Sequence, residues 1–388
     1  MPTTKRRLLI EGWRSVPHSY CLVNEQHILE LLSRGDIELA HRDLAYNDPG
    51  WTAETGLFAA DRERLIASLR APEAGERFDA VYRIAAPFNL GGSPWAERTV
   101  VFGTAEFGMV PAMFILGRQP LARTHRNSRC IIATPSNFSR QGFLKSGADA
   151  TRVVVVPHGA DTTLFTPMDE VQRTKSRKET GWDGFIFLTV GAATGNKGLD
   201  VLLKALAAVV KTHPRTHLII KGLDGLYRSG SLVNDMISQL SGEERGLIYG
   251  HVHYIGNAGP LGDVADLYRL ADAYVAPYRA EGFCLPALEA AACGTPVIAT
   301  QGGPTDDFLR DNFALRIRSR VVNVPDCYGE PGILFEPDLE HLIELMRRVI
   351  EEPDIARSAR AAGPAFVRSN YTWRHAVDKL VAVLFPEA

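Results

Sequence analysis

Short runs of aliphatic and β-branched residues alternate with helical patterns along the whole chain. Such runs occur at residues 7–11, 37–40, 80–85, 99–103, 130–134 and 153–156, and again at 185–190, 218–221, 252–255, 273–276 and 297–299. Several of the intervening segments repeat apolar residues with helical spacing, most clearly at 25–33, 62–69, 138–146 and 199–212. Strands that alternate with helices form parallel sheets. The sequence therefore predicts an α/β protein with two parallel sheets.

A connection between the two sheets is predicted at residues 157–178. This segment begins with Pro157 and Gly159, which favour irregular backbone, and it ends in a run of basic residues from Arg173 to Lys178. Residues 306–331 are predicted to form an irregular inserted loop, and residues 339–351 and 373–385 to form amphipathic helices. Open parallel sheets bind ligands at the carboxyl ends of their strands, so two such domains predict a protein that binds its ligand in a cleft.

Composition excludes several classes of protein. With 43 Lys and Arg against 45 Asp and Glu in 388 residues, the formal net charge of −2 gives no overall positive field for nucleic acid. The longest apolar runs fall far short of the ~20 residues that span a bilayer. The five cysteines are scattered, and the apolar run at residues 8–10 is too short for a signal peptide. We therefore expect a cytoplasmic protein with reduced thiols and no transmembrane segment.

Residues 277–298 carry the most specific chemical signal, a glycine-containing turn and a helix that follow a strand ending near Ala276. The free amides at the helix start, together with those of Phe283 and Cys284, suit a phosphate group. Glu281 precedes the helix and Glu289 lies about one turn into it, so two carboxylates flank this site and can accept hydrogen bonds from hydroxyl groups. Taken singly, each has a plain structural explanation, because Glu289 favours the helix dipole and Glu281 suits a solvated loop.

The pair of glutamates resembles the E-x7-E motif of retaining glycosyltransferases with the GT-B fold, the family 4 type. The residues between and after them, Gly-Phe-Cys-Leu-Pro and Cys-Gly-Thr-Pro, fit the same pattern. Residues 131–139, 155–167, 190–204 and 371–374 resemble further parts of that family, so the resemblance is continuous from about Cys130 to the end. The resemblance implies a two-domain organisation and a sugar-transfer reaction.

The domains implied by the resemblance are two Rossmann-like units that face a cleft. Residues 1–160 would form the acceptor-side domain, residues 161–370 the donor domain, and residues 371–388 a terminal helix that crosses back to the first domain. The implied enzyme is a hexosyltransferase that moves a sugar from a nucleoside diphosphate sugar to an acceptor hydroxyl with retention. The nucleotide sugar is a substrate, and no cofactor is expected. No metal ion is expected either, because both acids near the diphosphate are assigned to hydroxyl groups. The acceptor is a glycan, a lipid-linked molecule or a small molecule, nucleic acid is not expected, and a peripheral membrane contact is an additional expected partner.

Roles are expected for individual residues, most of them from the resemblance. Those of Glu106, Lys221, Trp13, Arg14 and His18 are expected from their places at the ends of strands. The expected catalytic residues are Lys197, which would reach the diphosphate, Glu281, which would contact hydroxyls of the donor sugar, and Glu106 in the first domain, for which a structural ion pair is the alternative. The expected donor-binding residues are Glu289 at the ribose, with Gly191, Lys221, Gly282, Phe283, Cys284 and Leu285 around the diphosphate and sugar. The expected cleft residues of the first domain are Trp13, Arg14 and His18, which follow its first strand.

Two departures from the family pattern concern the phosphate site and the first domain. The family usually has Arg directly after the glycine of Val190-Gly191, where this chain has Ala192; Lys221 is the expected substitute, with a surface lysine as the alternative. The family often has a His where this chain reads Gly-Thr-Ala-Glu at residues 103–106. The loss of both groups leaves open a catalytically silent partner subunit that only binds a nucleotide sugar.

Other enzyme classes lack their motifs. The chain has no G-x4-G-K-[ST] phosphate loop, no G-x-G-x-x-G after a strand, no H-E-x-x-H zinc motif and no G-x-S-x-G. One hydrolytic alternative stays open, a retaining glycoside hydrolase that would use Glu281 and Glu289 as its two carboxylates.

Overall fold

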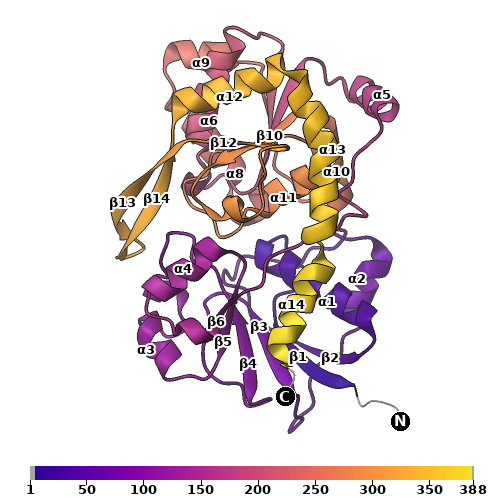
Figure 1. Ribbon diagram of the computed structural model, residues 1–388, viewed down its shortest axis with the longest axis vertical. Coiled ribbons are helices and arrows are strands. Elements are labelled where there is room, and N and C mark those ends of the chain that lie inside the picture. Colours follow the sequence, from indigo (N-terminus) through magenta and orange to yellow (C-terminus); the bar gives the residue numbers. More distant parts are fainter. Residues whose placement is uncertain (1–4, 387–388) are drawn as a thin grey trace. The chain divides into compact units, whose positions relative to one another are not determined.

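A computed structural model of the protein describes residues 5–386, so residues 1–4 of the predicted first domain and residues 387–388 of the predicted terminal segment lie outside it. The chain divides into two compact units (Figure 1). The first unit contains the residues up to Gly159, the segment Asn323–Ile333 and the residues from Trp373 onward; the second contains Ala160–Val322 and Leu334–Thr372. The segment Asn323–Ile333, which falls inside the predicted donor domain, thus groups with the first unit.

The first unit is built on a six-stranded parallel sheet with the strand order β2-β1-β3-β4-β5-β6. Its strands are β1 (Arg6–Gly12), β2 (Ile37–Asp43), β3 (Ala80–Ile84), β4 (Arg98–Phe102), β5 (Ile131–Thr134) and β6 (Val153–Val155). Its helices are α1 (Ser19–Arg34), α2 (Ala60–Ala67), α3 (Leu121–Arg126), α4 (Asn137–Lys145) and α14 (Trp373–Leu384). The C-terminal helix α14 contacts α1, β3 and β4, so the two ends of the chain belong to one unit.

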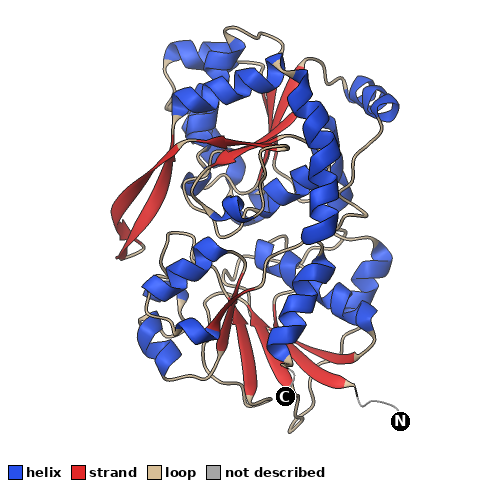
Figure 2. Cartoon of the chain, in the orientation of Figure 1, coloured by secondary structure: helices blue, strands red, loops and turns tan. Residues whose placement is uncertain are grey.

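The second unit again combines strands with surrounding helices (Figure 2). Its sheet has the strand order β12-β11-β10-β7-β8-β9. Its strands are β7 (Phe185–Val190), β8 (Thr216–Lys221), β9 (Val252–Ile255), β10 (Ala273–Ala276), β11 (Val297–Thr300) and β12 (Ala314–Ile317). Its helices are α5 (Glu170–Thr180), α6 (Leu199–Val210), α7 (Asp224–Tyr227), α8 (Ser229–Ser238), α9 (Gly242–Ile248), α10 (Leu261–Leu270), α11 (Leu285–Ala292), α12 (Leu339–Glu351) and α13 (Pro353–Asn370). The predicted fold class, α/β with two parallel sheets, is confirmed.

Both faces of the second sheet are buried, as parallel sheets require. Phe187 and Val275 point into a core shared with α6 and α12, while their neighbours Leu188 and Tyr274 point into a core shared with α10, α11 and α13. Successive side chains of a strand face opposite sides, so each core strand supplies both layers. Because helices cover the faces, a ligand can reach this sheet only at the strand ends and their loops.

The charged run predicted to lie in the connection forms a helix, which corrects that prediction. Helix α5 begins after Asp169, whose side chain caps it by accepting from the Gln172 amide at 2.9 Å. It has no buried residue. Ion pairs hold it to the unit instead, since Arg173 and Arg177 bind Asp272 at 2.5 and 2.8 Å. A pattern search that relies on apolar periodicity misses a helix of this kind.

The irregular loop predicted at residues 306–331 is also corrected. It contains the sheet strand β12 and most of a two-stranded hairpin formed by β13 (Ser319–Cys327) and β14 (Glu330–Pro337). Helix α13 was not predicted because Pro364 lies inside it, and proline usually marks a helix end. No helix within residues 5–386 has the length and apolar character needed to cross a bilayer.

Candidate active site

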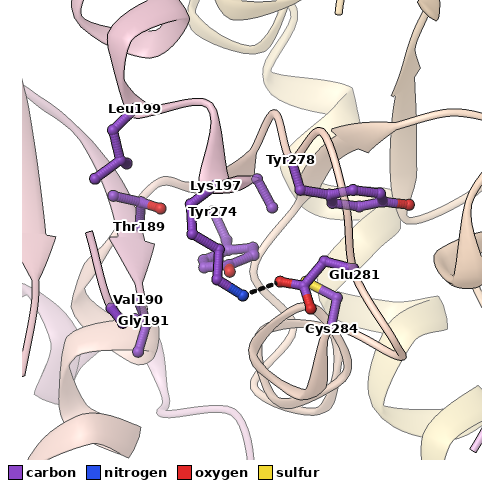
Figure 3. Close-up of a pocket in the computed structure, with 11 residues that line it drawn as sticks. Thr189, Val190, Gly191, Lys197, Leu199, Tyr274, Tyr278, Glu281 and Cys284 are labelled. Carbon is purple, nitrogen blue, oxygen red and sulfur yellow. Dashed lines mark hydrogen bonds and ion pairs between the residues drawn. The ribbon is translucent and has the colours of Figure 1, made fainter. Parts of the chain in front are cut away.

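The candidate site of the second unit lies where the strand order of its sheet switches. Strands β7 and β10 are neighbours, and the chain continues to β8 on one side and from β10 to β11 on the other. Loops after two such strands diverge and leave a crevice at their carboxyl ends. A pocket of about 300 Å³, counting space open to solvent, occupies this position (Figure 3). It is lined by Thr189, Val190, Gly191, Ala192, Lys197, Leu199, Tyr274, Ala276, Tyr278, Glu281 and Cys284.

An ion pair spans the pocket. Lys197 stands in a short turn before α6, and its ammonium donates to the Glu281 carboxylate from the loop after β10, as Figure 3 shows. The two side chains are 28% and 12% exposed, so both can meet a ligand while neither is free to swing into bulk water. The pair places one positive and one negative group together in a small, partly desolvated space.

The loops that carry this pair touch through their backbones. Gly198 has a φ of +67°, and a Cβ at this position would lie 1.9 Å from the carbonyl oxygen of Pro277, so only glycine fits. Beside it, the Arg279 amide donates to the Asn196 carbonyl at 2.6 Å, and the Asn196 side chain donates to the Ala280 carbonyl at 3.0 Å. These contacts fix Lys197 and Glu281 at a set separation.

Arg279 clamps the same loops from outside the pocket. Its guanidinium binds both oxygens of Asp200 at 2.7 and 2.9 Å and both oxygens of Glu336 at 2.7 and 2.9 Å. The bidentate bonds lower the pKa of Asp200 even though burial opposes that change. We missed this clamp in the sequence because Asp200 and Glu336 lie 79 and 57 residues away and no spacing relates them.

We expect Arg279→Ala to lower the free energy of unfolding by about 2–3 kcal/mol. The loss leaves two carboxylates unpaired, but both are partly exposed, so the cost stays below the 3–5 kcal/mol of a fully buried pair. Urea denaturation of the whole chain measures it. Arg357→Ala removes an exposed arginine that pairs only with exposed Asp354 and should change stability by less than about 0.5 kcal/mol. If Arg279→Ala and Arg357→Ala had the same free energy of unfolding, that result would contradict a stabilising role for the bonds of Arg279.

The start of α11 has an unusual backbone. Cys284 is the N-cap residue and has a φ of +68°, a left-handed conformation in which glycine is favoured. Burial raises the pKa of its thiol to about 12, so it stays protonated and unreactive. The helix begins at Leu285 and continues with Pro286, which has no N–H, and the Ala287 amide donates to the Cys284 carbonyl at 3.1 Å. The Leu285 amide is therefore the donor that the first turn leaves without an intrahelical partner.

The structure brings four of the predicted second-unit residues to the pocket and leaves five outside its lining. Gly191, Lys197, Glu281 and Cys284 line it, whereas Gly282, Phe283, Leu285, Glu289 and Lys221 do not. Phe283 is buried and stacks on Phe308 with ring centroids 4.9 Å apart. The Lys221 ammonium donates to the carbonyls of Gly222 and Asn257 at 2.9 and 2.6 Å, and burial lowers its pKa. The pocket therefore has Lys197 as the one cation in its lining.

Glu289 occupies an apolar setting within α11. Burial raises the pKa of its carboxyl to about 8, against an ordinary value of 4.5, and the Tyr268 hydroxyl donates to it at 3.0 Å. Tyr268 is fully buried, and we missed it in the sequence because no motif connects it to α11. The carboxyl is thus held neutral at pH 7 by its surroundings.

This burial predicts a pH dependence of stability. Because the folded pKa of Glu289 exceeds the unfolded one, its stabilising effect is complete below pH 4.5 and is lost as the pH rises through about 8. We expect Glu289→Gln, which keeps a hydrogen-bond acceptor without the charge, to remove a slope of up to about 1.4 kcal/mol per pH unit in that window. Denaturation of both proteins between these two pH values measures the difference. If the free energy of unfolding of the two proteins changed with pH in parallel, that result would contradict the raised pKa of Glu289.

The predicted first-unit residues follow β1 as expected, but most are engaged in structural contacts. Trp13 is 1% exposed and its indole donates to the Ala45 carbonyl at 2.9 Å. Arg14 binds Asp43 through two bonds of 2.8 and 2.6 Å. His18 caps α1, and burial lowers its pKa to about 4, so it is neutral.

Glu106 is half-buried and lies in the loop after β4. The pKa of Tyr328 is raised by burial and also by the charge of Glu106. The expected structural ion pair of Glu106 and its expected catalytic role both stay predictions.

The sequence profile described as "Glycosyl transferases group 1" matches residues 172–365, half of the chain, including the whole pocket. The chain belongs to this family. This group 1 glycosyltransferase is 30% identical over 281 residues to a D-inositol 3-phosphate glycosyltransferase of Thermomonospora curvata, covering 70% of this chain and 60% of the relative. It is 29% identical over 274 residues to that of Rhodococcus opacus, covering 70% and 55%. The chain therefore spans less than two thirds of these relatives.

Solved structures share the fold of this glycosyltransferase over nearly its whole length. HepE from Anabaena in complex with UDP has a TM-score of 0.67 at 15% identity, covering 97% of this chain and 99% of that one. A glycosyltransferase from Rickettsia africae has a TM-score of 0.68 at 15% identity, covering 99% and 100%. These likenesses extend the shared architecture to the first unit, where the family profile does not reach.

Proposed function

We propose that this glycosyltransferase moves a hexose from a nucleoside diphosphate sugar to an acceptor hydroxyl with retention at the anomeric carbon. The observation that carries the proposal is the Lys197–Glu281 pair in a pocket at the switch point of the sheet, beside the start of α11. A diphosphate needs cations and N–H donors, and a sugar needs carboxylate acceptors. The pocket offers both within one small volume. HepE, whose fold it shares, has been solved with UDP-glucose, which supports a nucleotide sugar as the donor.

In the proposed reaction the bond between the anomeric carbon and the leaving phosphate oxygen breaks, and its electron pair stays on the diphosphate. Lys197 and the amides at the start of α11 stabilise that growing charge. The acceptor oxygen forms the new bond on the same face, and its proton passes to the leaving phosphate oxygen. Glu281 orients the sugar hydroxyls. No step needs a metal ion or a cofactor.

The pocket disfavours the hydrolase alternative. A retaining glycoside hydrolase needs two carboxylates about 5 Å apart on one sugar. Here Glu281 alone lines the pocket, while Glu289 binds Tyr268 away from that lining. The silent binding partner is a second candidate, because Ala192 leaves the phosphate site with one cation fewer than the family pattern.

Release of nucleoside diphosphate from UDP-glucose and other nucleotide sugars, with and without an acceptor mixture and with excess EDTA, tests the proposal. We expect release that depends on an acceptor and persists in EDTA. Binding without release would support the silent partner. Release that magnesium restores after chelation would contradict the metal-free reaction, and an inverted product would contradict retention.

A further inference from the structure

One stretch of the first unit is basic without any acidic residue. Residues 107–148 contain six Lys and Arg and no Asp or Glu, although the chain as a whole has slightly more acidic than basic residues. The net charge of −2 for the whole chain does not reveal this local excess of positive charge. It includes the loop before α3, helix α3 and helix α4.

Four arginines of this stretch stand exposed and unpaired with carboxylates. They are Arg118, Arg123, Arg126 and Arg129. Arg123 donates to the Gln119 side chain at 3.2 Å, and within residues 5–386 none of the four forms an ion pair. Arg123 and Arg126 are three residues apart on α3 and therefore share one face of the helix. The four guanidinium groups lie within residues 118–129, so they raise the positive potential of this part of the chain.

Exposed apolar side chains lie in the loop that leads to these arginines. Met113 is 45% exposed and Leu116 is 53% exposed, three residues apart on either side of buried Ile115. The loop is anchored by the Leu116 amide, which donates to the Phe88 carbonyl at 3.0 Å. Tyr328 at the hairpin tip, 55% exposed, adds to the same surface through its contact with Phe114, whose ring centroid is 5.2 Å away.

The loop is held in a shape that projects these side chains outward. Gly117 and Arg118 both have positive φ, at +81° and +52°, so the chain turns sharply directly after Leu116. Single exposed hydrophobic residues are ordinary on a protein surface. Exposed apolar residues directly followed by a tight turn and four unpaired arginines are a more specific combination.

We propose that this surface, made of residues 112–120, helix α3, Arg129 and Tyr328, docks on an anionic lipid bilayer. The arginines bind headgroup phosphates, and Met113 and Leu116 enter the boundary between headgroups and acyl chains. A soluble polyanion such as nucleic acid would match the arginines but would bury no apolar side chain. The backbone amides of Ala112 and Gly329 donate to Glu330 and Asp326, and Asp149, which follows the stretch, pairs with Arg152.

Sedimentation of the whole chain with vesicles tests the proposal. We expect binding to phosphatidylcholine vesicles that contain about 30 mol% phosphatidylglycerol, weakening with added salt, and little binding to pure phosphatidylcholine. The variant Arg123→Glu with Arg126→Glu should bind at least about tenfold more weakly, and so should Met113→Ser with Leu116→Ser. The control, Arg357→Glu with Arg368→Glu, makes the same charge change on exposed residues of α13 and should bind as the wild type does.

Three results would overturn the proposal. The first is absence of binding to the anionic vesicles at low salt. The second is equal loss of binding in the α3 variant and the α13 control, because net charge alone would then explain the interaction. The third is binding of heparin or single-stranded DNA that depends on Arg123 and Arg126 while vesicles are ignored, which would assign the surface to a polyanion. Circular dichroism of each variant confirms that it is folded.

Discussion

Lys197→Ala is expected to lower turnover by about 10²–10³-fold, the usual cost of losing one donor that stabilises charge in a transition state. Lys197 is the one cation in the pocket lining, and Ala192 beside it offers no substitute. Donor affinity should change less than turnover, because the charge on the phosphate grows mainly as the anomeric bond breaks. Steady-state kinetics with a saturating acceptor separate the two effects.

The ion partner of Lys197 provides the matched control. Glu281→Gln frees the ammonium from its carboxylate while leaving the cation in place. We expect this variant to lose transfer yet to keep or improve its affinity for the free nucleoside diphosphate, since a negative charge has left the site. A fully active Lys197→Ala would remove that residue from the reaction. Weaker nucleotide binding in Glu281→Gln would show that Lys197 needs its carboxylate for orientation.

Glu289→Ala is expected to weaken binding of the nucleoside diphosphate by about 10- to 150-fold, which corresponds to the loss of hydrogen bonds to a charged group. The proposal behind this number is that the carboxylate accepts from the ribose hydroxyls of the donor. Hydrogen bonds donated by the ribose hydroxyls favour the ionised form of the Glu289 carboxyl, whose pKa is about 8 in the free protein. Nucleotide binding should therefore release protons near pH 7, which calorimetry in buffers of different ionisation enthalpy detects.

Tyr268→Phe distinguishes this role from a purely structural one. The substitution removes the hydroxyl that donates to Glu289 and leaves the ring in the core. If Glu289 binds ribose, the tyrosine variant should keep most of its nucleotide affinity while the alanine variant loses it. Equal losses in the two variants, or unchanged affinity in a folded Glu289→Ala, would show that the carboxyl only supports α11.

The sequence predicted those features that depend on local pattern or on strand ends. Strand β7 was predicted at residues 185–190 and is found there, because a run of buried aliphatic residues needs no distant information. The resemblance assigned both Gly191 and Glu281 to the donor site, and both line the pocket. Their roles in the reaction stay predictions.

Other features depend on contacts between distant segments. The Arg279 clamp joins the loop after β10 to the start of α6 and to β14, and nothing near Arg279 in the sequence marks it as a partner of Asp200. Helix α5 and strand β12 were missed because one is held by ion pairs and the other is a four-residue edge strand. The position of Lys221 was predicted correctly at a strand end, but its bonds to Gly222 and Asn257 depend on the course of the next loop.

The close approach of Gly198 to the Pro277 carbonyl has a consequence for how the site is acquired during folding. The two residues belong to loops that are far apart in the chain, and the strands before them must pair before the loops can meet. Closing such a long segment costs chain entropy before any contact repays it. Because β7 precedes β10 in the chain, the half of the pocket that follows β7 is synthesised well before the half that follows β10. A nascent chain that ends before β10 holds a lysine without its glutamate, and ligand binding can begin only once the later strand has joined the sheet.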